Sequence, residues 1–312
     1  SALWCSGVCG VIKKKMELIE KSDRLQFHYY FKDNSHSINS ILRNECEKEI
    51  LYIYKEISET LGLQLILESL PTEEGGFKET WRFIGKNSVQ ITLIISVAAV
   101  IISRFPAENK ELTELQIENL KLDNEIKRKE LERLNLDFLQ EEKELNQQTV
   151  RDSVELVNKN YKISWRKSNL YKKLSDYPKV DSVEVLRYDE EKPVGNPRKI
   201  TRREFSKFIL QTDDLPKLEL EKVTIDVISA VIKRGKFRWK GFYNKEIINF
   251  LMDDFVFKNQ VLNGAINFSN RFSLEVKMTQ DRKINQDGNI TNTNSIVHKV
   301  IASVDQGQRI EY

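Results

Sequence analysis

The sequence predicts an α+β protein with a membrane helix. Its parts are a small N-terminal βαβ-type module, a single transmembrane helix, a long helical or coiled-coil stalk and a C-terminal α+β domain with an antiparallel sheet. Three observations predict this class. Residues 87–103 carry no charge and are apolar around the whole helix from Ile91 on. Residues 107–150 contain neither glycine nor proline. The rest alternates β-prone runs with turn signals.

Composition restricts the classes of function. A chain of 312 residues with 40 % hydrophobic and 31 % charged residues is too apolar to be wholly disordered. The net charge of +3 hides an asymmetry, because residues 151–312 hold 30 basic and 22 acidic side chains. We therefore expect an anionic partner for the C-terminal half. Three cysteines and three widely spaced histidines argue against a disulfide scaffold and a structural zinc site.

We expect residues 1–20 to form a tail and residues 21–85 to form the small α/β module. In the tail, Cys5 and Cys9 lie near a run of three lysines, which suits either a palmitoylated anchor or an irregular tail. The order of apolar and basic residues is opposite to that of a signal peptide. In the module, residues 25–31 predict a strand, 38–61 a helix ended by Gly62, and 63–70 a second strand. Gly75-Gly76 then predicts a flexible joint.

Residues 86–105 predict the transmembrane helix. Seventeen uncharged residues span about 25 Å against roughly 30 Å of hydrocarbon, and Lys86 and Arg104 can snorkel to extend this length. Aromatic residues flank the segment at Trp81, Phe83 and Phe105. The alternative is a buried helix or strand of a soluble core. The span is favoured because the next fifty residues resemble an isolated hydrophilic helix, which offers no core. The flanking charges do not indicate an orientation.

Residues 106–160 predict a coiled-coil helix that makes the protein a homo-oligomer. An asparagine at a core position would set the register, and the heptad register changes part-way along the helix. The alternative is a solvated single helix held by pairs four residues apart. The oligomerisation candidates are Leu112, Leu115, Asn119, Leu122, Ile126, Leu131, Leu134 and Phe138.

Residues 161–312 predict a basic α+β domain. Residues 164–174 suggest a short helix and 180–188 a strand, and Thr201 with Glu204 forms a capping box before a helix over 202–210. A β-prone run covers 218–233. A hairpin turns at Asn244, and Asp253 with Asp254 caps a helix that ends near residue 262. Residues 265–279 and 295–304 complete the sheet around a polar loop.

No catalytic motif is specific enough to assign an enzyme, and we expect neither cofactor nor metal. The best functional signal is a basic run before and within the predicted hairpin. On a strand, its cations would share one face, and Phe237 and Trp239 would point to the core. Such a face suits phosphates of nucleic acid, nucleotide or lipid. The alternative is an ordinary solvated face that protects a sheet edge. The four cations are Arg234, Lys236, Arg238 and Lys240.

A second basic cluster lies at the N-terminal end of the helix predicted over 202–210. Positive charge is unfavourable there because of the helix dipole, unless an anion compensates it. The mismatch points to a ligand or an acidic partner. The residues are Arg198, Lys199, Arg202 and Arg203.

Several features together resemble a group of uncharacterised bacterial single-pass membrane proteins associated with antiphage defence. They are the aromatic strand, the turn Ser35-His36-Ser37, the stretch Arg43-Asn44-Glu45-Cys46-Glu47, Gly75-Gly76, the apolar segment and the charged helix. The resemblance covers mainly residues 25–150 and assigns no catalytic residue. It implies a membrane-anchored protein of antiviral defence.

The first functional hypothesis is a membrane-anchored oligomeric scaffold or effector that contacts membrane lipid and a protein or anionic partner. The alternative hypothesis is a soluble sensor of nucleic acid or nucleotide, in which residues 87–103 are buried at a partner interface. A third, an enzyme with a site built from scattered residues, stays open because a sequence without motifs does not exclude it.

Overall fold

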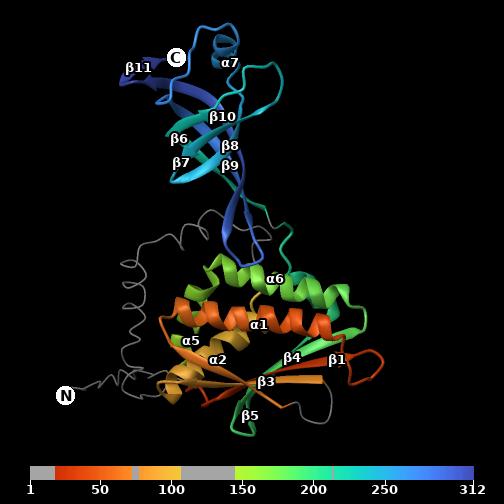
Figure 1. Cartoon of the computed structure of the whole chain (residues 1–312). Coiled ribbons are helices and arrows are strands. Elements are labelled where there is room, and N and C mark those ends of the chain that lie inside the picture. The colour runs from red at the N-terminus through yellow and green to blue at the C-terminus, as the bar shows by residue number, and fades with distance from the viewer. Residues whose placement is uncertain (1–17, 72–76, 107–144, 213) are drawn as a thin grey trace, which may run out of the picture. The chain divides into compact units, whose positions relative to one another are not determined.

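The computed structural model describes residues 18–71, 77–106, 145–212 and 214–312, and these fall into two compact units. The N-terminal unit comprises the described residues up to Ile209, and the C-terminal unit begins at Leu210. Figure 1 shows the elements of both units. Each unit has its own hydrophobic core and is described by itself.

The N-terminal unit is built on a five-stranded antiparallel sheet with the order β2-β3-β1-β4-β5. The strands are β1 (Arg24–Phe31), β2 (Leu65–Leu70), β3 (Phe77–Gly85), β4 (Val180–Asp189) and β5 (Lys192–Thr201). Strand β3 lies between β1 and β2, so the predicted β-helix-β unit is split by a strand that follows it in the chain. The module therefore does not stand alone, because its sheet is completed from residues 180–201.

Four helices cover one face of this sheet (Figure 1). They are α1 (Ser40–Thr60), α2 (Ser88–Ser103), α5 (Gln147–Asn158) and α6 (Tyr161–Asp176). Alternate residues of β1, such as Phe27 and Tyr29, are buried beneath them. Tyr54 of α1 packs edge-on against Trp81 and Phe83 of β3 at ring-centroid distances of 5.7 and 5.2 Å. The buried alternate residues of the strands thus pack against the apolar faces of the helices in one core.

The apolar segment is a core helix of this unit. Helix α2 packs against α1, α5 and strands β3 and β4, and residues such as Ile94 and Ile95 are fully buried. Its polar residues are satisfied by the same unit: Thr92 Oγ1 accepts from the backbone N–H of Ser22 at 3.1 Å. In the part of the chain that the structure describes, no helix combines the length and hydropathy needed to cross a membrane. The predicted transmembrane helix over 86–105, and with it a single-pass membrane localisation, is therefore wrong.

The predicted stalk over 106–160 is also wrong for the part that the structure describes. Residues 147–158 form the short helix α5, which packs on α2, and a further helix, α6, follows at once. Among the described residues no long helical stalk occurs. The predicted positions Leu112, Leu115, Asn119, Leu122, Ile126, Leu131, Leu134 and Phe138 lie outside the described residues, as do Cys5 and Cys9.

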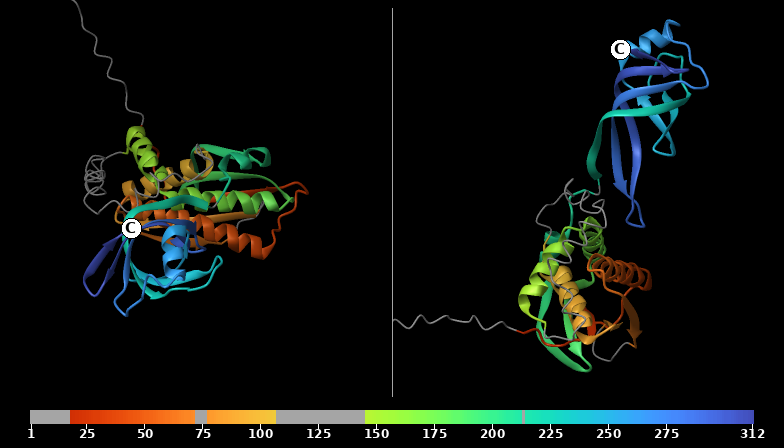
Figure 2. Two further views of the ribbon diagram at one scale, coloured as in Figure 1. Left: turned by 90° about the horizontal axis from the view of Figure 1, so that it is seen from above. Right: turned by 90° about the vertical axis from the view of Figure 1, so that its left-hand side faces the viewer.

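The C-terminal unit is a closed barrel of five strands. They are β6 (Asp214–Ser229), β7 (Arg238–Tyr243), β8 (Glu246–Met252), β9 (Ser273–Ile284) and β10 (Ile290–Asp305). The order β10-β8-β7-β6-β9 closes through pairing of β9 with β10, and a short edge strand, β11 (Gln308–Glu311), is added to β10. Figure 2 shows β9 and β10 as a long hairpin whose tip extends from the barrel.

The connections of this barrel are those of the OB-fold. Three strands follow one another as a meander, helix α7 (Phe255–Leu262) comes next, and the last strand, β10, pairs parallel with the third, β8. The hairpin predicted around Asn244 is confirmed, with positive φ at both Asn244 and Lys245, as a two-residue turn requires. Asp254 caps α7, as predicted, by accepting from the backbone N–H of Phe257. Residues 161–209, predicted to belong to this domain, form part of the N-terminal unit.

Candidate functional site: the basic face of the C-terminal barrel

The candidate site lies on the outside of strands β7 and β8 and on the loop that precedes β7. We call it the basic face. Strand β7 alternates exposed and buried residues, so the charged and aromatic side chains of alternate positions point outward together. The basic face consists of Lys233, Arg234, Lys236, Phe237, Arg238, Lys240, Phe242 and Asn249.

The strand register places polar and aromatic groups in rows across the hairpin. Lys240 lies opposite Asn249, and Phe242 lies opposite Ile247. Phe242 is 42 % exposed and Ile247 is 58 % exposed. An exposed phenylalanine beside an exposed isoleucine forms an apolar patch next to the cations. Strand neighbours across an antiparallel pair are close enough to contact one ligand together.

The loop before β7 differs from its prediction. Strand β7 begins at Arg238. Arg234 and Lys236 therefore lie in the loop and do not share a strand face with Arg238. Phe237 is 48 % exposed and is not a core residue, whereas the predicted burial of Trp239 is confirmed at 0 % exposure. The ring of Phe237 lies against Gly235, where a Cβ would come within 2.8 Å of it. The exposed part of the Phe237 ring is therefore available to a ligand.

The interior of β7 is packed tightly beneath this face. The Trp239 ring lies 5.7 Å from that of Phe268 and 6.1 Å from that of Phe250, between centroids. Gly241 allows β7 to approach Ile225 of β6, because a Cβ at this position would lie 2.4 Å from Ile225 Cγ2. The outward-pointing side chains of β7 are thus held by a strand whose inner face is closely packed.

The charges of the barrel are not distributed evenly. On the side formed by β6 and β9, lysines are matched by carboxylates: Lys217–Asp281, Lys222–Glu275, Lys277–Glu221 and Lys283–Asp214, with N–O distances of 2.7 to 3.4 Å. On the basic face, no ion pair within the described residues involves Lys233, Arg234, Lys236 or Lys240. Along the strand register, the neighbouring carboxylate is Asp226, opposite Phe242. The basic face therefore keeps an uncompensated positive potential.

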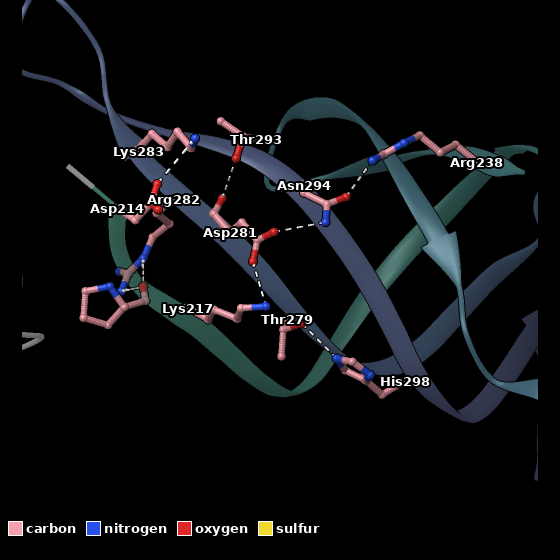
Figure 3. Close-up of polar contacts among 11 residues, drawn as sticks. Asp214, Lys217, Arg238, Thr279, Asp281, Arg282, Lys283, Thr293, Asn294 and His298 are labelled. Carbon is pink, nitrogen blue, oxygen red and sulfur yellow. Dashed lines mark hydrogen bonds and ion pairs between the residues drawn. The ribbon is translucent and has the colours of Figure 1, made fainter. Parts of the chain in front are cut away.

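A chain of polar contacts orients Arg238 (Figure 3). Its Nη2 donates to Asn294 Oδ1 at 2.7 Å, and Asn294 Nδ2 donates to Asp281 Oδ2 at 3.0 Å. Asp281 also pairs with Lys217 at 3.2 Å. The hydrogen bond from Asn294 and the charge of Lys217 lower the pKa of Asp281, which keeps it an acceptor. Four strands thus contribute to holding one guanidinium on the barrel surface.

The second predicted cluster does not form one site. Arg202 donates to the backbone carbonyls of Leu174, Tyr177 and Val180 at 3.0 to 3.2 Å, and so satisfies the C-terminal end of α6 and the turn after it. The helix predicted over 202–210 is a short 3₁₀ segment, Arg202–Phe208, and it has the predicted capping box.

The other members of that cluster point to different surroundings. Arg198 pairs with Glu204 at 2.6 Å, and the Lys199 Nζ lies 3.9 Å from the ring centroid of Tyr30. Arg203 is exposed. The dipole mismatch that suggested a ligand is explained for Arg202 by the carbonyl groups that it binds.

Sequence reasoning missed Phe242, Asn249 and Asn294. Phe242 could have been found, because it shares the period-two face of Arg238 and Lys240 in the predicted hairpin. Asn294 gives no such signal, since its role depends on a pairing between segments 56 residues apart.

Comparison of the chain with family models, with curated proteins and with solved structures found no match in any of the three. Among the described residues, no group of three or more histidine, cysteine or acidic side chains is arranged to hold a metal ion. The geometry of the barrel is therefore the basis for assigning a function.

Proposed function

We propose that the C-terminal barrel binds single-stranded nucleic acid on its basic face. The observation that carries this proposal is the concentration of exposed phenylalanines and of cations without an ion pair among the described residues on β7 and its preceding loop, while the lysines of β6 and β9 are paired with carboxylates. Strands two and three of an OB-fold barrel, here β7 and β8, are where this architecture binds oligonucleotides.

The mixture of groups favours a single strand over a duplex. Arg238 and Lys240 alternate on one strand face and can contact successive phosphates of an extended chain. Phe237 and Phe242 expose ring surface on which unpaired bases can stack, and stacking tolerates any base because each has a π-face. Asn249 adds a side chain that can donate to or accept from a base edge.

The test uses the full chain and a fluorescent oligothymidylate, with binding followed by anisotropy at several salt concentrations. Four phosphate contacts predict a plot of log affinity against log salt with a slope of about −3 for a single strand. Replacing Arg234, Lys236, Arg238 and Lys240 by Gln should remove most binding and flatten this slope. Phe242→Ala should weaken binding by about fivefold or more at an unchanged slope, because stacking carries no charge.

The matched control changes the same net charge on the paired side of the barrel. A variant with Lys222, Lys277, Lys283 and Arg309 replaced by Gln should keep most of the affinity, because these cations already face carboxylates and lie outside the contacts that hold Arg238. Equal losses in the two quadruple variants would show a general charge effect and contradict the proposal. Equal affinity for a duplex of the same sequence would contradict the single-strand assignment.

A further inference from the structure

The N-terminal unit contains a cleft of about 830 Å³ that the proposed function does not use. It is bounded by α2, α5, β4, β5 and the segment Leu18–Glu20. Its volume is within the range of sites for small molecules and cofactors. Apolar side chains form part of its wall, among them Val100, Val150 and Val194.

Four arginines and one carboxylate line this cleft. Arg198 is paired with Glu204, but Arg104, Arg151 and Arg187 make no ion pair within the described residues. Arg104 donates to the backbone carbonyl of Asn196 at 2.7 Å, and Arg151 donates to Gln147 Oε1 at 3.1 Å. The cleft therefore holds three guanidinium charges that form no ion pair with a carboxylate in the part of the chain that the structure describes.

Arg187 is half-buried, whereas the other three arginines are exposed. Its Nη1 donates to Ser96 Oγ of the buried helix α2 at 2.7 Å, and its guanidinium lies against Gly195, where a Cβ would come within 2.3 Å of Nη2. Burial lowers the pKa of Arg187; the charge of Glu20 opposes this effect, and the charge of Arg104 adds a smaller lowering. A cation that is desolvated in this way is costly unless an anion pairs with it directly.

Glu20 attracts Arg187 without forming a direct ion pair with it. Its Oε2 accepts from the backbone N–H of Gly195 at 2.6 Å, and it is not within ion-pair distance of Arg187. No hydrogen bond to a described residue uses Nη2 or Nε of Arg187, so both atoms keep donors for a ligand. A planar guanidinium donates in a fork that fits phosphate oxygens, and three such groups suit a ligand with several negative charges.

We propose that this cleft binds a small phosphorylated molecule of the nucleotide type, with its phosphates on Arg187, Arg104 and Arg151 and its base against the valine wall. This inference does not depend on the function proposed for the barrel, because the cleft is formed entirely by the N-terminal unit.

The test measures binding by calorimetry in a full chain whose Arg234, Lys236, Arg238 and Lys240 are already replaced by Gln, so that the barrel does not contribute. The probes are ATP, inorganic triphosphate and adenosine. We expect ATP to bind, triphosphate to bind more weakly and adenosine not to bind. Arg187→Met should weaken ATP binding by about tenfold or more, and Arg187→Lys should weaken it less. Arg203→Gln, an exposed arginine outside the cleft lining, is the matched control and should bind as the parent does.

A melting experiment separates a ligand site from a structural role. Without ligand, Arg187→Met should melt at the same temperature as the parent or higher, because it removes a cation that burial disfavours. ATP should raise the melting temperature of the parent and not that of the variant. No binding of ATP or triphosphate, or undiminished binding by Arg187→Met, would overturn the inference. Failure of this test leaves oligothymidylate binding by the wild-type barrel unaffected, so the two proposals are judged separately.

Discussion

Asn294→Ala isolates the contribution of orientation to the proposed binding of single strands. The substitution removes the amide that accepts from Arg238 at 2.7 Å and donates to Asp281 at 3.0 Å, but it changes no charge. Hydrogen bonds to charged groups contribute about 1.5–3 kcal/mol. Water can replace much of this at the exposed Arg238, so we expect a loss of about 0.5–1 kcal/mol, which is about two- to fivefold in affinity.

The assay is anisotropy of labelled oligothymidylate at several salt concentrations, with Arg238→Gln measured alongside. Asn294→Ala should weaken binding without changing the salt slope, whereas Arg238→Gln should reduce the slope by about 0.7, the value for one phosphate contact. Asn292→Ala, an exposed position two residues earlier on β10, is the control and should have no effect. Wild-type affinity in Asn294→Ala, together with a loss in Arg238→Gln, would refute the idea that Arg238 must be held in place.

Three further predictions concern stability, each followed by urea unfolding. Ile94→Ala should destabilise the N-terminal unit by about 2–5 kcal/mol, because Ile94 is fully buried in α2, whereas Ile41→Ala at an exposed site of α1 should change stability by less than about 0.5 kcal/mol. Gly241→Ala should cost the barrel about 1–3 kcal/mol through overpacking against Ile225, and an unchanged midpoint would contradict the packing described. Burial raises the pKa of Glu79 above its unfolded value. The protonated carboxyl therefore stabilises the folded state at acid pH, and this stabilisation is lost as pH rises through the folded pKa. The difference in unfolding free energy between Glu79→Gln and wild type should therefore shift in favour of the variant from about pH 4 to pH 7.

Local features of the fold could be predicted because they depend on neighbours in sequence. The turn at Asn244, the cap at Asp254 and the capping box at Thr201 and Glu204 each need a few adjacent residues, and all three occur. The sheet order could not be predicted, since β3 enters between β1 and β2 and β4 joins β1 from a segment about 150 residues away. Pairings of this separation leave no periodic signal in either strand.

The basic face was predictable in part for the same reason. Arg238 and Lys240 share a strand face by period two, and that part of the prediction needs the hairpin alone. Arg234 and Lys236 depend on where the strand begins, and the strand begins later than their pattern suggested. The contacts that hold Arg238 come from β9 and β10, which reach β7 only because the barrel closes.

The misassigned helix shows why an apolar pattern alone does not identify its solvent. A helix that is apolar on all sides needs an apolar environment, and lipid and a protein core meet that need equally. What separates them in α2 is its polar residues: Thr92 bonds to Ser22, and Ser96 accepts from Arg187 of β4. A hydroxyl in lipid would bond within its own helix, whereas these two bond to other elements. The charged partner Arg187 lies 91 residues from Ser96 in the sequence. The contact that identifies α2 as a core helix therefore depends on the fold and could not be inferred from the local sequence.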